Sequence, residues 1–261
     1  MSQPSLSSSA EGTADSIEPL GSPSNARVFL RNADTLEEHS IDWAVATGSL
    51  LAQAAPWRTF RWYMDQRHYS GTYWSSTNTG HVIYESRLEL ARLMLADFDP
   101  WVTRIVAQPF LLTTVVNRRQ RKHIPDFLLI TNDVPAVIDV KPAWQLEKPK
   151  VRFTLDWTRK LVESRGWRYE VWSEAPAVEL QNVRFLAGYR NARLFDPALL
   201  SELRQMRLEG KTLGEAFDAP SSRPPALVRS AVLHMVWNSE LAVDISTTLT
   251  RSSIFQKGPK K

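Results

Sequence analysis

Three ionisable residues stand at the ends of two apolar runs in the segment HIPDFLLITNDVPAVIDVK, residues 123–141. Asp126 opens the run DFLLIT, while Asp139 and Lys141 close the run AVIDVK. Carboxylate oxygens are the ligands that Mg²⁺ prefers, and an ammonium group can stabilise the charge that develops on a phosphate. The pattern Pro-Asp, spacer, Asp-x-Lys therefore has metal-assisted phosphodiester chemistry as one interpretation.

The two runs are rich in Val, Ile, Leu and Phe, and the turn-forming tetrapeptide NDVP separates them, so we predict a β-hairpin. With NDVP as the loop, Asp126 stands opposite Lys141. Because side chains alternate along a strand, Asp139 shares the face of these two residues. The hairpin therefore gathers three charged groups at one end of one face. The opposite face is expected to carry Phe127, Leu129, Ile138 and Val140.

The competing interpretation is an ordinary hairpin whose ends reach water. In that case Lys141 and Asp126 form an exposed cross-strand pair, which contributes roughly 0.2–1 kcal/mol. In the metal-site interpretation, Asp126 and Asp139 bind the ion, and Lys141 acts on the attacking water or on the developing phosphate charge. Both interpretations use the same three residues.

A helix is expected before these strands, in HVIYESRLELARLMLADFD, because its apolar residues recur at helical spacing. This helix offers Glu85 and Glu89, which are four residues apart and so lie on one side. Either glutamate could complete the oxygen shell of a metal; the alternative is a solvated helix face with Arg92 as ion partner. A second helix is expected in KPKVRFTLDWTRKLVESRGW, ending at Gly166, followed by the strand RYEVW. Helix, three strands, helix and strand is the layout of a restriction-endonuclease-like core, and we predict this α/β fold.

With these residues in place, the sequence resembles the TnsA-like endonuclease subunits of heteromeric transposases, which are PD-(D/E)xK nucleases. The resemblance spans about residues 55–250 and is weaker through VRSAVLHMVWNSELAVDIS. It implies that Glu89, rather than Glu85, is the helix acid, that Asp126 is the principal metal ligand and that Lys141 is the catalytic lysine. Position 139 varies in the family, and Asp139 follows the general nuclease pattern of a direct ligand. The segments that carry the resemblance are QRHYSGTYWSSTNTGHVIYESRLELARLMLADFDPWVTRIVAQPF, HIPDFLLI, VIDVKP, GWRYEV and NVRFLAGYR.

The resemblance also implies an activity and partners. Such subunits cut the non-transferred strand of double-stranded DNA at transposon ends, while a separate integrase-type transposase subunit cuts and joins the other strand. An ATPase regulator is the second implied partner. We expect Mg²⁺ as the cofactor, with Mn²⁺ able to substitute, and water as the nucleophile. Hydrolysis would then leave a 5′-phosphate and a 3′-hydroxyl.

Composition predicts how the chain is divided. Residues 1–25 are rich in Ser, Pro and Gly, which is typical of a disordered tail. We predict a nuclease domain over 26–195, a winged-helix-like partner-binding domain over 196–255 and a basic tail over 256–261. Within the second domain, Asp196 and Pro197 are expected to begin a helix that Gly210 ends. Another helix is expected in SSRPPALVRSAVLHMVWNSE and a strand in LAVDIS. The alternative for this domain is a stabilising unit without a partner.

The segment NRRQRK supplies four cations, Arg118, Arg119, Arg121 and Lys122, just before the hairpin. One interpretation is a solvated hairpin turn, and the other is a phosphate-contacting loop beside a catalytic site. Residues 40–80 are aromatic-rich, and we expect them to be irregular. Their aromatic residues are interpreted first as packing at the edge of the core and second, with Arg58, Arg61 and Arg67, as DNA contacts.

The overall composition excludes several classes of protein. The chain has 261 residues, of which 43% are hydrophobic and 23% charged, as in globular domains. No apolar run approaches the ~18 residues of a membrane helix, and no secretory signal is visible. The absence of cysteine excludes disulfides and cysteine-bound zinc, and the five histidines lack metal-binding spacing. A net charge of +4 is compatible with nucleic acid. We expect a soluble cytoplasmic protein of a prokaryote, associated with the nucleoid when active.

Two alternatives to this endonuclease remain open. The first is a non-catalytic DNA-binding or adaptor subunit of the transposition complex, which keeps the nuclease fold for assembly. The intact set Glu89, Asp126, Asp139 and Lys141 argues against it, since an adaptor needs none of these residues. The second alternative is a restriction or repair nuclease of the same fold.

Overall fold

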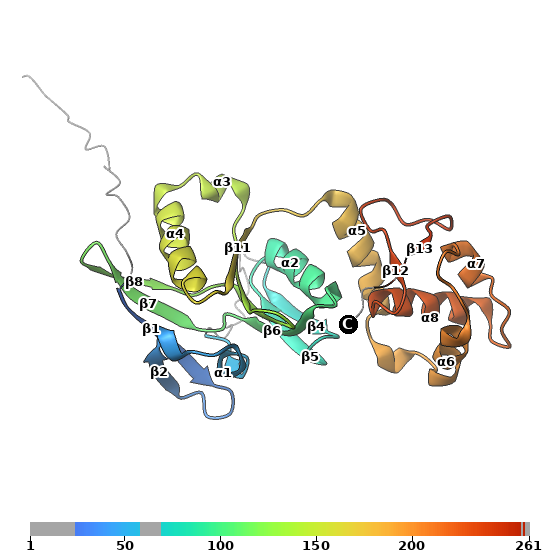
Figure 1. Cartoon of the computed structure of the whole chain (residues 1–261), viewed down its shortest axis with the longest axis horizontal. Coiled ribbons are helices and arrows are strands. Elements are labelled where there is room, and N and C mark those ends of the chain that lie inside the picture. Colours follow the sequence, from blue (N-terminus) through green and yellow to red (C-terminus); the bar gives the residue numbers. More distant parts are fainter. Residues whose placement is uncertain (1–23, 58–68, 257, 259–261) are drawn as a thin grey trace, which may run out of the picture.

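The computed structural model describes residues 24–57, 69–256 and 258. Three parts follow one another along the long axis of the molecule (Figure 1). A sheet of N-terminal strands and a long hairpin lie at one end, a central sheet between helices lies in the middle, and a helical C-terminal part forms the other end. Asp126 of the HIPDF segment belongs to the middle part.

Strands that are far apart in sequence form a five-stranded antiparallel sheet. Its members are β1 (Ser24–Asn32), β2 (Glu38–Asp42), β3 (Ala54–Ala55), β7 (Leu111–Val116) and β8 (Arg119–His123). Two predictions are thereby corrected. Ser24 and Asn25 were expected in a disordered tail, but Ser24 pairs with Val115 and accepts a hydrogen bond from Thr114. Residues 40–80 were expected to be irregular, but they contribute to strands and to the short helices η1 (Trp43–Val45) and α1 (Gly48–Leu51).

The central sheet has four strands in the order β11–β10–β9–β6. They are β6 (Val102–Ala107), β9 (Phe127–Thr131), β10 (Ala136–Val140) and β11 (Arg168–Trp172). The β9–β10 pair is the predicted hairpin, and β11 runs parallel to β10 after a helical crossover. The predicted order of helix, strands, helix and strand is therefore present, with the β7–β8 hairpin as an addition within it.

The register of the β9–β10 hairpin differs from the prediction. Phe127 pairs with Ile138 and Leu129 with Ala136, so Asp126 stands one step on, opposite Asp139 instead of Lys141. The reason lies in Thr131, whose hydroxyl donates to the Val134 carbonyl oxygen and accepts from the Asp133 N–H. These bonds tie Thr131 to the turn, while Thr131 stays the last residue of β9 and pairs with Val102 of β6. The shift preserves the faces of the strands, so the three charged residues still share one face.

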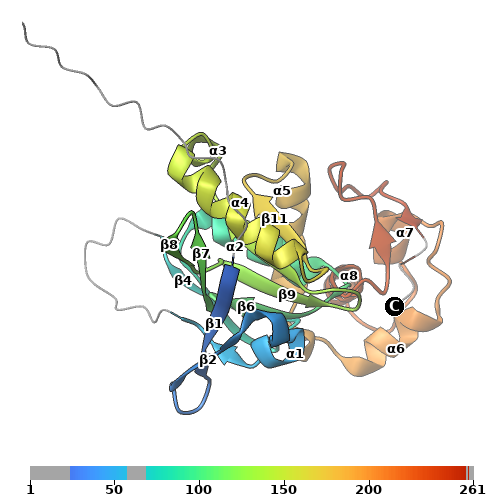
Figure 2. The same ribbon diagram turned by 60° about the vertical axis from the view of Figure 1, so that its left-hand side comes forward.

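Two helices cover opposite faces of the central sheet (Figure 2). On one face, Phe127 and Ile138 pack in the core that includes α2 (Arg87–Phe98). On the other face, Leu128 and Val137 pack against α4 (Pro149–Glu163), where Trp157 is buried. The predicted alternation of side chains is therefore confirmed.

The ends of these helices follow local signals. The Ser86 side chain caps the first turn of α2, and residues before it form β5 (Gly80–Tyr84), which pairs with β4 (Gly71–Ser75). The predicted helix thus begins later, at Arg87. Gly166 has a positive φ of 71° just after α4, as its predicted role as a helix stop requires. The short helix α3 (Ala143–Leu146) connects Lys141 to α4.

The C-terminal part is mainly helical. Its elements are α5 (Ala177–Leu186), η2 (Ala187–Tyr189), η3 (Ala192–Leu194), α6 (Pro197–Gln205), α7 (Leu213–Phe217), α8 (Pro225–Trp237) and the paired strands β12 (Ala242–Val243) and β13 (Phe255–Gln256). Asp196 caps α6 and Pro197 begins it, as predicted. The helix ends at Gln205 instead of near Gly210, because the Gly210 N–H donates to the Phe255 carbonyl oxygen and draws this segment toward β13. Gln256 lies in β13, so the predicted basic tail begins one residue later at the earliest.

One continuous hydrophobic cluster joins the middle and C-terminal parts. It extends from Tyr73 to Phe255 and includes residues of α2, α5 and α8. The predicted boundary at residues 195 and 196 lies inside this cluster, and the division into two domains stays a prediction. Among the helices that the structure describes, none is long and apolar enough to cross a bilayer.

Candidate active site

Asp126 and Lys141 form the centre of the site, at the start of β9 and just beyond the end of β10. The Asp126 N–H donates to the Ile138 carbonyl oxygen at 3.0 Å, which fixes the aspartate on the hairpin. Its Oδ2 accepts from the Lys141 Nζ at 2.8 Å and from the Val140 N–H at 2.6 Å. The predicted pair is therefore in direct contact, although the two residues are not cross-strand partners.

Asp139 shares their face but is engaged elsewhere. It is fully buried, and both of its oxygens lie 2.8 Å from the His123 Nε2. The Tyr169 hydroxyl donates to the same carboxylate at 2.5 Å. A role of Asp139 as a direct metal ligand stays a prediction, and it requires His123 to release at least one oxygen.

Glu89 lies in the first turn of α2 and serves the helix as well as the site. Its carboxylate accepts from the Ser86 hydroxyl at 2.9 Å and from the Glu85 N–H at 2.8 Å. Glu85 precedes the helix and accepts from the Gln108 amide at 2.7 Å. Arg92, which the alternative interpretation gave as the ion partner of these glutamates, makes a two-point ion pair with Glu170.

Gln108 contacts both Glu85 and Asp126. Its side chain donates to Glu85, and its backbone N–H donates to the Asp126 carbonyl oxygen at 2.9 Å. It is buried and has a φ of 46°, a left-handed conformation that is uncommon outside glycine and is concentrated at functional sites. The sequence pattern gave no indication of this role.

His123 and Tyr169 were also not predicted as site residues. His123 contacts Asp139 from β8, a strand of the other sheet, and Tyr169 contacts it from the neighbouring strand β11. The one local signal was the position of His123 three residues before Asp126 in HIPDF.

Burial is the largest cause of the pKa shifts of Glu89 and Asp126. Burial, and then the charge of Asp126, raises the pKa of Glu89 to about 7. Burial also raises the pKa of Asp126, although the Lys141 ammonium opposes this shift. Burial alone would lower the pKa of Lys141, but the charges of Asp126 and Asp139 outweigh it and raise that pKa. Two carboxylates that are costly to ionise thus face a single ammonium group.

Asp139 shows the opposite behaviour. Burial would raise its pKa, but the His123 ring, Lys141 and the Tyr169 hydroxyl together lower it. Its negative charge is therefore already compensated by protein groups.

A cleft of about 730 Å³ brings the site residues together. Its walls come from the start of α2, the end of β8, the ends of the β9–β10 hairpin and α3. The lining residues are Glu85, Ser86, Leu88, Glu89, Leu111, Lys122, His123, Ile124, Asp126, Val140, Lys141, Pro142 and Gln145. Glu89, Asp126 and Lys141 thus open into one hollow, and His123 separates that hollow from Asp139.

The carboxylates of Glu89 and Asp126 suit a hard divalent cation, because a positive charge between them would offset the burial that raises both pKa values. Within the described residues, no group of three or more Asp, Glu, His or Cys side chains is arranged to hold a metal. Two carboxylates with water and substrate oxygens nevertheless match the way Mg²⁺ is usually bound.

The four predicted cations lie on the β7–β8 hairpin. Asn117 and Arg118, both with positive φ, form its two-residue turn between the paired residues Val116 and Arg119. Lys122 reaches the cleft wall, while the Arg121 guanidinium stacks on Phe153 of α4 at 4.7 Å. Only part of this cluster is therefore next to the acids. Arg58, Arg61 and Arg67, predicted as further contacts, lie outside the described residues.

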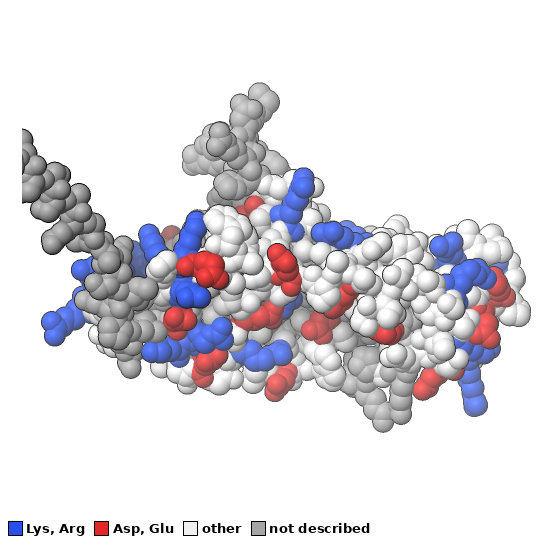
Figure 3. All heavy atoms as spheres, turned by 90° about the horizontal axis from the view of Figure 1, so that it is seen from above, with Lys and Arg blue, Asp and Glu red and all other residues white. Residues whose placement is uncertain are grey.

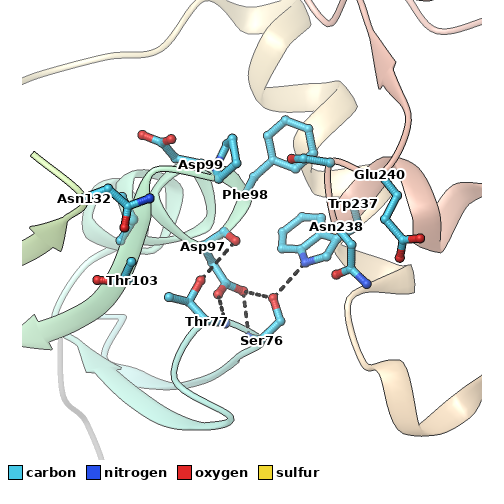
Figure 4. Close-up of a pocket in the computed structure, with 13 residues that line it drawn as sticks. Ser76, Thr77, Asp97, Phe98, Asp99, Thr103, Asn132, Trp237, Asn238 and Glu240 are labelled. Atoms are coloured by element: carbon cyan, nitrogen blue, oxygen red, sulfur yellow. Dashed lines mark hydrogen bonds between the residues drawn. The ribbon is translucent and has the colours of Figure 1, made fainter. Parts of the chain in front are cut away.

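A second hollow, of about 580 Å³, lies between α2, the β4–β5 turn and the end of α8 (Figure 4). Its buried acid, Asp97, accepts five hydrogen bonds, from Tyr73, Ser75, Ser76 and Thr77. The Trp237 indole N–H donates to the Ser76 hydroxyl at 2.7 Å. This carboxylate is saturated by neutral donors, so the hollow holds a structural junction and lacks the reactive groups of the first cleft.

A comparison with known protein families finds a similarity over the segment that carries Asp126, Asp139 and Lys141. Residues 99–174 match the family model described as the TnsA-like endonuclease N-terminal domain. The match confirms the predicted resemblance over β6 to β11, which includes Asp126, Asp139 and Lys141. Glu89 lies before the matched segment. No curated protein matches the chain.

Proposed function

We propose that this chain is a metal-dependent DNA endonuclease subunit of a heteromeric transposase, with a restriction-endonuclease-like core. The observation that carries the proposal is the convergence of Glu89, Asp126 and Lys141 on one cleft, within or next to a segment similar to TnsA-like endonucleases. The substrate is double-stranded DNA at transposon ends, where the non-transferred strand is cut.

The chemistry follows from the charges at the site. Glu89 and Asp126 hold the cation, and Asp139 is a further ligand if His123 moves away. Mg²⁺, or Mn²⁺ in its place, supplies charge neutralisation for the phosphate and lowers the pKa of water when bound. In the metal-free cleft the charges of Asp126 and Asp139 raise the pKa of Lys141, which favours its ammonium form. Its ammonium group stabilises negative charge that develops on the phosphate oxygens.

Partner binding belongs to the C-terminal part in this proposal. Two helices, α7 and α8, precede the short β12–β13 pair. Thr212, which lies between α6 and α7, forms an isolated antiparallel β-bridge with Ile254. This order supports a winged-helix-like unit. An integrase-type transposase and an ATPase regulator are the partners that this unit would contact.

A non-catalytic adaptor is the second candidate, and one observation favours it. Both oxygens of Glu89 accept hydrogen bonds from the start of its own helix, which is a capping role that needs no metal. A restriction or repair nuclease of the same fold would share the cleft and differ only in its partners.

Strand cleavage by the assembled complex tests the proposal. Asp126→Asn and Lys141→Ala should each reduce cleavage of the non-transferred strand by at least ~100-fold, as expected when a principal electrostatic group is lost. Asp133→Asn, in the exposed β9–β10 loop, is the matched control and should cut normally. Circular dichroism must show that each variant is folded. Unchanged cleavage by folded Asp126→Asn would favour the adaptor.

A further inference from the structure

Trp144 stands out among the tryptophans because it is exposed beside the candidate active site. Its side chain is 62% exposed, and it lies on α3, three residues after Lys141. Pro142 and Gln145 of the same turn line the cleft. Of the described tryptophans, one other is largely exposed, Trp101 at 49%. That residue precedes β6 at the opposite end of the central sheet, since Val102 pairs with Thr131 and Ala107 with Phe127.

The position of Trp144 is fixed relative to Lys141. The Lys141 N–H donates to the Trp172 carbonyl oxygen at 2.9 Å, which ties this end of β10 to β11. The Gln145 N–H then donates to the Pro142 carbonyl oxygen at 2.8 Å, and the Lys148 N–H donates to that of Gln145 at 3.1 Å. Consecutive turns therefore place the backbone of Trp144 between two residues that line the cleft, Pro142 and Gln145.

A lysine lies next to this ring. The Lys148 ammonium is 4.3 Å from the centre of the Trp144 ring, and Lys150 follows on the first turn of α4, where Arg152 forms an ion pair with Glu147. Lys122 is among the residues that line the cleft. Lys and Arg side chains gather at the end of the molecule that carries the β7–β8 hairpin and α4, with some acids between them (Figure 3). A polyanion would be attracted to this end of the molecule.

We infer that Trp144 and Lys148 bind one unpaired nucleotide next to the scissile phosphate, with the base stacked on the indole and its phosphate near the ammonium. This inference rests on the proposed nuclease function. An exposed aromatic ring stacks on any base without reading its sequence. A paired base hides its faces inside the duplex. The preferred substrate is therefore DNA that is locally unpaired at the cut.

Equilibrium binding of the full chain to labelled DNA tests this inference, with Ca²⁺ replacing Mg²⁺ so that the strands stay intact. The probes are a perfect duplex and the same duplex with one extra, unpaired 2-aminopurine nucleotide. The wild type should bind the second probe more tightly and quench its fluorescence. Trp144→Ala should weaken that binding by about tenfold or more and abolish the quenching, while binding to the perfect duplex changes less than twofold. Trp144→Tyr should restore most of both effects.

Two controls separate the possible outcomes. Trp101→Ala removes an equally conspicuous ring and should change neither probe. Asp133→Asn, in the exposed β9–β10 loop, should keep the preference for the unpaired base. If Asp126→Asn stops cleavage while Trp144→Ala binds both probes like the wild type, the nuclease function stands and the stacking role is wrong. Unchanged binding by Trp144→Ala would assign the exposed ring to a protein contact, which also overturns the inference.

Discussion

Glu89 does two things with one carboxylate. It closes the start of α2 through the Ser86 hydroxyl and the Glu85 N–H, and it faces Asp126 across the cleft. Burial of the Glu89 carboxylate strengthens its capping hydrogen bonds and also makes its ionised form costly. A cation at the cleft would remove that cost, whereas a protein that only needs a helix cap gains nothing from the nearby acid. The state of this one carboxyl group therefore distinguishes the two candidate functions.

The raised pKa of Glu89 predicts how stability changes with pH in metal-free protein. In the unfolded chain Glu89 loses its proton near pH 4.5, but in the folded chain it does so near pH 7. Between these values the folded state holds more protons, so stability falls as pH rises. The difference amounts to at most about 3 kcal/mol. Urea unfolding in the presence of chelator should show this decline, and Glu89→Gln should flatten it. An equal decline in both proteins would contradict the account.

At this scale the sequence predicted the residues whose partners are local. Asp126 and Lys141 were found from the hairpin, because the observed register moves each residue's partner by two positions, which keeps their common face, whereas a shift by one would not. His123, Tyr169 and Gln108 were missed, because each reaches an acid through the packing of separate strands. The engagement of Asp139 could not be predicted for the same reason.

Among the elements, helices were predicted better than strands. The stop signal Gly166 after α4 and the start signals Asp196 and Pro197 of α6 are contained in the segments themselves. The strand β8, in contrast, reads RQRKH and has no apolar alternation, so it resembles a polar turn until β7 pairs with it. The strand β2 is also largely exposed and pairs with β1, whose own pairing with β7 joins residues far apart in sequence. Strands of this kind are specified by their neighbours.

The crossover from Lys141 to β11 depends on a correct end to α4. Gly166 has a φ of 71°, and a Cβ added there would meet no atom within 4 Å, so the cost of a side chain is purely conformational. Gly166→Ala should therefore lower the free energy of unfolding by about 1–2 kcal/mol. Gly188→Ala is the matched control, because Gly188 also has open space but is not in the left-handed region. Equal stability of the two variants in urea unfolding would show that the turn is not strained by alanine.

Over the whole molecule, the continuous core indicates that the two predicted domains support one another. Phe98 of α2 and Trp237 of α8 lie with ring centres 5.3 Å apart, next to the hydrogen bond from Trp237 to Ser76 (Figure 4). At this junction the buried Asp97 carboxylate accepts hydrogen bonds from the β4–β5 turn and thereby holds the turn against α2. The C-terminal part is thereby attached to the helix that carries Glu89.

This junction predicts a single cooperative unfolding transition. Asp97→Asn replaces one carboxylate oxygen by an amide NH₂ group, which cannot accept hydrogen bonds from the buried donors around it. The free energy of unfolding should therefore fall by about 2–4 kcal/mol. Calorimetry should show one transition, which moves as a whole to lower temperature. Asp99→Asn, at an exposed neighbouring position, should leave it nearly unchanged. Two transitions, of which only one moves, would mean that the parts unfold independently.

Metal binding is the most direct test of the central claim, because it can be measured on this chain alone, without the partner subunits of the proposed complex. Titration calorimetry with Mn²⁺ should give a binding isotherm for the wild type and for Asp133→Asn. Glu89→Gln and Asp126→Asn should each lose most of the affinity, and wild-type binding should tighten as pH rises through about 7, where Glu89 ionises. If the folded wild-type protein shows no heat of binding with or without DNA, or if both acid variants bind as it does, the cleft is not a metal-dependent nuclease site.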